Sequence, residues 1–217
     1  MNPQTDVQRL AGFIEAELPR NTWKPWPGGW PDQIEAALID AVLSIAAQYG
    51  TPENGVRGAV SRYRKAIGAD RPDDLARLAA YDPEKLQDVL NNQKVSGRTK
   101  ASAIVEAAGN LLALGVKTAT DLDAHNSAQK RAYTCVHGLG PVTWDYFGML
   151  LGKLGVKADR WILRFVSRGL GRDLTPAEAR SLLHEVADRL DATPTELDHA
   201  IWAYERDRQA PESRESV

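Results

Sequence analysis

The sequence contains a single cysteine, Cys135, among its 217 residues. This excludes an internal disulfide, and it also excludes a four-cysteine zinc or iron–sulfur site built within one chain. Long apolar runs are missing as well, since no stretch approaches the ~20 apolar residues that cross a bilayer. The first residues, MNPQTDVQRL, lack the basic start and apolar core of a signal peptide. We therefore expect a soluble, cytoplasmic protein that has no contact with a membrane.

The sequence also lacks the strict apolar–polar alternation that is typical of half-buried β-strands. Apolar residues recur instead at helical spacing, for example over residues 34–49 and 56–67. Helix starts are marked at Asp82, Thr175 and Thr193, each of which is followed by a proline. The pattern predicts about ten helices joined by short turns, and therefore an all-α fold of the bundle type.

Three tryptophans fall within residues 21–31, NTWKPWPGGWP, a segment with too much proline and glycine for a helix. We expect an extended arm that presents Trp23, Trp26 and Trp30. The indoles could cover an apolar surface or serve as a stacking platform for bases, and we favour the first role because burial is the commoner use of tryptophan. The polar tail, residues 209–217, is expected to be disordered.

The charge is unevenly distributed along the chain, although the total is only −2. Residues 94–172 carry 12 Lys and Arg against 5 Asp and Glu, whereas both flanking segments are acidic. A basic segment inside an acidic frame is compatible with binding to nucleic-acid phosphates. Solvated helix faces would give the same count, so charge alone leaves both interpretations open.

A tight turn between two helices is indicated by VHGLG, residues 136–140, which is followed by Pro141. Two glycines one residue apart permit positive φ angles and the close approach of another backbone. Outward-pointing amides at the start of the second helix would suit a phosphate oxygen, and the candidates are Gly138, Gly140, Val142 and Thr143. The motif fits a sequence-independent phosphate clamp, and a plain turn between packed helices is its alternative.

This hairpin resembles the signature of the helix–hairpin–helix DNA glycosylase superfamily. In that signature a Gly-x-Gly turn is followed by x-x-Thr and, further along the chain, by Asp-x-x-(Val or Ile)-x-Arg. The matching residues here are Gly138, Gly140, Thr143, Asp159, Ile162 and Arg164. The resemblance implies that DNA is the partner and that Asp159 is the catalytic residue. Arg164 could contact a DNA phosphate or pair with an acidic neighbour.

Earlier segments are similar to the same superfamily. SIAAQYG, residues 44–50, resembles its first core helix, which ends in a glutamine that probes the duplex. Gln48 or the adjacent Tyr49 would then fill the gap that an extruded base leaves in the stack. Lys100 begins a segment that resembles the family's Lys-Ala-x-x-Ile helix, which implies that Lys100 binds DNA.

The departures from the family pattern also carry information. Bifunctional members have a nucleophilic lysine at the position of Val142, and valine cannot form a Schiff base. The string that follows Thr143 is closest to the alkylpurine branch, which also lacks this lysine. The frequent Asp-x-His becomes Asp159-Arg160-Trp161. The candidates for the wall of a base pocket are Trp144, Tyr146 and Trp161.

The chemistry expected of Asp159 follows from the reaction. Breaking an N-glycosidic bond builds positive charge on the sugar, and one carboxylate can stabilise that charge and orient or deprotonate water. A base that is already cationic, such as an N-alkylated purine, needs no second acid to leave. Asp159 is equally suited to cap the helix that follows it, a contribution of about 1 kcal/mol.

Together these features lead to one expected architecture and activity. By the family's plan, a helical barrel of residues 31–155 faces a second lobe of residues 1–30 and 156–217, with DNA in the cleft between them. We expect a monomeric, nucleoid-associated enzyme that excises a damaged base, with an alkylated base as the first candidate, from duplex DNA. No metal or organic cofactor is expected, apart from a monovalent cation that could join the hairpin to a phosphate. A non-catalytic protein of the same fold that recognises distorted DNA is the alternative.

Overall fold

The computed structural model describes residues 3–47, 54–153 and 155–209. The chain forms two compact units, which we describe separately: unit 1 comprises Met1–Gly28 and Leu154–Val217, and unit 2 comprises Gly29–Lys153. The boundaries expected from the sequence fall two residues later at both junctions. The tail expected to be disordered lies outside the described residues except for Gln209, which ends the last helix.

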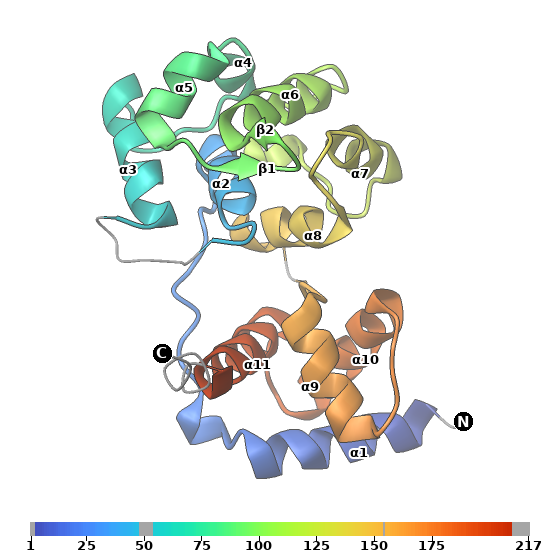
Figure 1. The fold of residues 1–217 in the computed structure, drawn as a ribbon. Coiled ribbons are helices and arrows are strands. Elements are labelled where there is room, and N and C mark those ends of the chain that lie inside the picture. Colours follow the sequence, from blue (N-terminus) through green and yellow to red (C-terminus); the bar gives the residue numbers. More distant parts are fainter. Residues whose placement is uncertain (1–2, 48–53, 154, 210–217) are drawn as a thin grey trace. The chain divides into compact units, whose positions relative to one another are not determined.

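The described residues form eleven α-helices, two short 3₁₀ turns and one two-stranded sheet, so the predicted all-α class is confirmed (Figure 1). Unit 1 contains α1 (Pro3–Glu17), η1 (Arg20–Thr22), α9 (Arg160–Leu170), α10 (Pro176–Arg189) and α11 (Pro194–Gln209). Unit 2 contains α2 (Ile34–Leu43), α3 (Val56–Ile67), α4 (Leu75–Ala79), α5 (Pro83–Leu90), β1 (Lys94–Val95), β2 (Arg98–Thr99), α6 (Lys100–Leu112), η2 (Ala119–Asp121), α7 (Ser127–Thr134) and α8 (Pro141–Leu150). None of the described helices is both long and apolar enough to cross a membrane.

Helix α2 is the central element of unit 2. All ten of its residues are buried, and α3, α4, α6 and α8 pack against it. Its one buried glutamate, Glu35, accepts hydrogen bonds from the Tyr63 hydroxyl at 2.6 Å, the Asp74 amide at 2.8 Å and the Arg77 guanidinium at 2.7 and 2.9 Å. A buried carboxylate is tolerated here because its oxygens are fully hydrogen-bonded.

Unit 1 has its own apolar core, formed where α1 and α11 pack on α9 and α10. The rings of Phe13 on α1 and Phe165 on α9 lie 5.2 Å apart. Gly169 makes this approach possible, because a Cβ at that position would lie 2.6 Å from the Phe13 ring. The packing of α9 on α1, α10 and α11 fixes the orientation of the helix, and with it the position of its first turn.

The tryptophan arm is used for packing. The Trp23 indole donates to the Leu18 carbonyl at 2.9 Å and packs on the core of unit 1. The Trp26 ring lies edge-on to His199, 5.2 Å away. Trp30 is buried in unit 2, where its indole donates to Asp40 at 2.8 Å. The structural role predicted for these tryptophans is confirmed for Trp23 and Trp30.

Candidate nucleic-acid interface

The turn between α7 and α8 is held by a small set of contacts. Val136 and Leu139 are buried and anchor it to unit 2, whereas His137 is exposed. The Gly140 amide donates to the Thr143 hydroxyl at 3.1 Å, and that hydroxyl donates back to the Gly140 carbonyl at 2.8 Å. The Thr143 side chain therefore satisfies the backbone of the N-cap residue Gly140, as the third helical residue does in a capping box.

Three amides of this turn have no acceptor among the described residues; they belong to His137, Gly138 and Val142. The amides of Gly140 and Thr143 are engaged within the turn, by the Thr143 hydroxyl and the Gly140 carbonyl. The sequence-based expectation of four outward amides is therefore wrong for Gly140 and Thr143. The remaining donors sit at the positive end of the α8 dipole, where an anion is favoured.

The two glycines of the turn have different surroundings. Gly138 has a φ of +94°, and a Cβ there would lie 2.8 Å from a methyl group of Val95. Gly140 has an extended backbone, with φ −141°, and a Cβ there would meet nothing within 4 Å. The fold therefore requires a glycine at 138 but not at 140. Open space in front of Gly140 leaves the backbone accessible to a group from outside the protein.

Asp159 is the N-cap of α9. Its Oδ1 accepts from the amides of Trp161 at 2.8 Å and Ile162 at 3.2 Å. Its Oδ2 lies 4.0 Å from the Lys157 ammonium, and the Asp159 side chain is 16% exposed. The capping role that the sequence left open is thus present. One carboxylate oxygen is used by the helix, and the other is directed at a cation and reachable by solvent.

The first turns of α9 carry a cluster of two arginines around one indole. The guanidinium carbons of Arg160 and Arg164 lie 4.8 and 5.5 Å from the centre of the Trp161 ring. Neither arginine forms an ion pair with a carboxylate in the described part of the chain. One turn further on, Arg168 differs, because it pairs with the buried Glu205 at 2.6 Å. Positive charge without a described carboxylate partner is therefore concentrated at the Asp159 end of α9.

Lys100 does not face solvent, which corrects its expected role in DNA binding. Its side chain is buried, and its ammonium donates to the carbonyls of Leu43 at 2.9 Å and Ile45 at 2.6 Å and to Gln93 at 2.8 Å. Burial lowers the pKa of the Lys100 ammonium to about 8. The lysine satisfies carbonyls at the end of α2, as cations near helix C-termini do.

Two residues expected in the wall of a base pocket also belong to the core of unit 2. Trp144 is 1% exposed, packs against both Tyr133 and Phe147, and donates its indole hydrogen to the Ala124 carbonyl at 3.0 Å. Tyr146 is buried, and its hydroxyl lies 3.4 Å from an Asp40 oxygen. Neither ring can stack on a base in this conformation, whereas Trp161 is partly exposed. Gln48 and Tyr49 lie outside the described residues.

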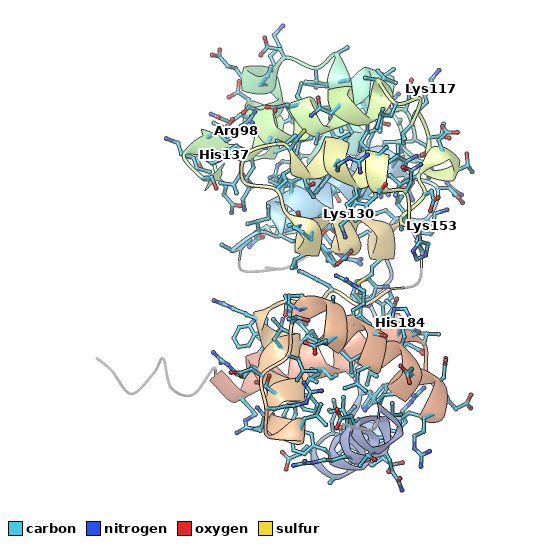
Figure 2. The ribbon with its side chains drawn as sticks, turned by 90° about the vertical axis from the view of Figure 1, so that its right-hand side faces the viewer. Arg98, Lys117, Lys130, His137, Lys153 and His184 are labelled. Carbon is cyan, nitrogen blue, oxygen red and sulfur yellow. The ribbon has the colours of Figure 1, made fainter. Side chains whose placement is uncertain are left out.

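The basic segment 94–172 is divided between the two units, and several of its charges are neutralised. In unit 2, Arg98 pairs with Glu106 at 2.6 Å and Lys130 with Asp145 at 3.6 Å. Figure 2 shows Arg98 and His137 at one edge of unit 2 and Lys117 at the opposite edge. No group of three or more potential metal ligands occurs within residues 3–47, 54–153 and 155–209.

A solved structure described as "Structure of MBOgg1 in complex with low affinity DNA ligand" is similar to this chain. The two share 16% sequence identity with a TM-score of 0.59, over 96% of this chain and 71% of the other. At this identity the likeness shows a shared all-α fold. No curated protein sequence matches the chain significantly. The family model described as "Domain of unknown function (DUF8548)" matches residues 8–206. Because this match covers most of the chain, the protein belongs to that family, DUF8548.

Proposed function

We propose that this protein binds DNA through the turn of residues 136–143 and excises a damaged base with Asp159, leaving an abasic site. An alkylated base is the first candidate substrate. The proposal is supported by the glycosylase-type order of hairpin, threonine and aspartate in the sequence, and by the fold shared with a protein described in complex with DNA. Neither a resident metal nor an organic cofactor is needed, since a carboxylate and water suffice for the hydrolysis.

The observation that carries the proposal is the unused binding capacity of the hairpin. The amides of Gly138 and Val142 donate to no described acceptor, and the space in front of Gly140 is open. Amides at a helix start with clear access suit a phosphate oxygen and read no base sequence. A plain turn between packed helices would need Gly138, but it would have no use for Gly140.

The proposed chemistry uses Oδ2 of Asp159, the oxygen that does not cap α9. With Oδ1 fixed by two amides, Oδ2 keeps a constant direction and can stabilise positive charge on the sugar or orient water. The Lys157 ammonium lies 4.0 Å from this oxygen. Val142 offers no amine, so we expect no Schiff base and no cut in the strand.

We assign Arg160, Trp161 and Arg164 to the strand that carries the damaged base. Two guanidinium groups without a carboxylate partner favour phosphate, and the indole between them keeps both arginines ordered. The positive end of the α9 dipole adds to the attraction. This assignment extends the expectation of a phosphate contact from Arg164 to Arg160, which lies one helical turn earlier.

The direct test is mass spectrometry of free bases released from methylated, deaminated and oxidised duplex DNA. Wild type is expected to release one class of base, and Asp159→Asn to release none above background. Asparagine caps helices as well as aspartate does, so this variant keeps the start of α9 while removing the charge. The exposed Asp173 of the same unit provides a matched control, because Asp173→Asn removes an equal charge and should leave release unchanged.

A non-catalytic DNA-binding function is the second candidate, and the capping role of Asp159 favours it. A residue that is already needed to begin α9 requires no catalytic duty to explain its presence. In that case wild type would bind DNA in a salt-sensitive way and release no base from any of the three substrates. Asp159→Asn would then bind DNA as wild type does.

A further inference from the structure

The two-stranded sheet of unit 2 ends in a tight turn next to the hairpin. Strands β1 and β2 pair antiparallel, with Lys94 opposite Thr99 and Val95 opposite Arg98. Ser96 and Gly97 form the two-residue loop, and both have positive φ, +48° and +83°. This is the conformation of a type I′ hairpin turn, in which the loop residues project beyond the strands.

This β-turn packs directly on the α7–α8 hairpin. Val95 is buried, and its methyl group and the Ser96 hydroxyl would lie 2.8 and 3.2 Å from a Cβ at Gly138. The absence of a side chain at Gly138 therefore brings the two turns into contact. Figure 2 shows Arg98 and His137, one from each turn, at the same edge of unit 2.

The β-turn presents polar groups that the protein itself does not use. Lys94 is exposed and forms no ion pair with a described carboxylate, and the exposed Ser96 hydroxyl has no hydrogen-bond partner among the described residues. Arg98 is different, because Glu106 at 2.6 Å and Ser102 at 2.9 Å engage its guanidinium. Lys94 therefore adds one positive charge without a described carboxylate partner to the strand pair whose turn contacts the hairpin.

We propose that the β1–β2 turn is a second phosphate-binding element, in which Lys94 and the Ser96 hydroxyl bind a backbone phosphate of DNA close to the one held by the hairpin. This inference rests on the proposed DNA binding at residues 136–143 and adds residues to it. A single turn binds one phosphate, whereas two turns in contact bind neighbouring phosphates and so fix the direction of the DNA strand that crosses them. Because no base edge is involved, the added element strengthens binding without adding sequence preference.

The test measures the affinity for an undamaged, fluorescein-labelled duplex by anisotropy, over about 50 to 200 mM salt. Lys94→Ala should weaken binding about fivefold, and the slope of log affinity against log salt should fall by about 0.9, as expected for one lost phosphate contact. Ser96→Gly should weaken binding less and leave the slope unchanged. Glycine suits the positive φ of position 96, so the turn is retained.

Lys117→Ala is the matched control. Lys117 is an exposed lysine of the same unit that forms no ion pair with a described carboxylate, and Figure 2 places it far from His137. If Lys94→Ala and Lys117→Ala have the same duplex affinity and salt slope while Gly140→Val binds poorly, the proposed role of the β-turn is wrong. The proposed role of the hairpin would then stand. If wild type shows no salt-sensitive binding at all, the proposed function fails together with this inference.

Discussion

The starts of helices α6 and α8 lie in the same unit, yet their polar groups are used in opposite ways. At the start of α6, the Lys100 ammonium points inward and donates to three oxygen acceptors. At the start of α8, the amides of Gly138 and Val142 donate to none in the described structure. A polar group at a helix start is a good binding candidate only where the fold has not already engaged it.

Within the α8 start, the largest loss of stability is expected on substitution of Gly138. Gly138→Val places a branched side chain at a φ of +94° and against Val95, and should lower the free energy of unfolding by about 4 kcal/mol. Gly140→Val introduces the same side chain into open space with an extended backbone, and should cost about 1 kcal/mol or less. Urea unfolding followed by circular dichroism measures both values, and equal losses would contradict the different roles of the two glycines.

A smaller effect, on the pH dependence of the free energy of unfolding, tests the burial of the Lys100 ammonium. Its folded pKa, about 8, lies below its ordinary value of 10.5, so between these pH values the unfolded chain binds more protons than the folded protein. The free energy of unfolding should therefore rise with pH across this window, by on the order of 2 kcal/mol. Lys100→Met removes the titrating group and should lose this rise.

The measurement compares urea unfolding of wild type and Lys100→Met from pH 7 to 11. The free energy of unfolding of wild type should increase relative to that of Lys100→Met as the pH increases. If the free energies of unfolding of the two proteins change with pH in parallel, Lys100 titrates as an exposed lysine does. Lys100 would then again be a candidate for DNA binding.

The sequence is sufficient to predict the helical class and several helix starts. Thr175 and Thr193 each exchange hydrogen bonds with the glutamate three residues later, and Asp82 caps α5 as expected. These predictions succeed because capping is local and depends on residues within one turn. The β1–β2 turn was not expected, since two strands of two residues each are too short to show any alternation.

The candidate site was predicted less completely, because burial depends on residues far apart in the chain. Nothing local distinguishes Trp144, which is enclosed by Tyr133 and Phe147, from Trp161, which lies at a helix start between arginines. The inward direction of Lys100 is set by the end of α2, more than fifty residues earlier. Asp159 fits both of its possible roles in the sequence, and the structure adds the hydrogen bonds of the cap.

The central claim is that the hairpin of residues 136–143 binds the DNA backbone, and Gly140 tests it most directly. The measurement is the duplex affinity of wild type and Gly140→Val by fluorescence anisotropy at several salt concentrations, with the fold of the variant checked by thermal unfolding. We predict salt-sensitive binding by wild type, and at least about a tenfold loss in a variant that remains folded. Equal affinities of the two folded proteins would contradict the account, because the open space at Gly140 would then have no part in binding.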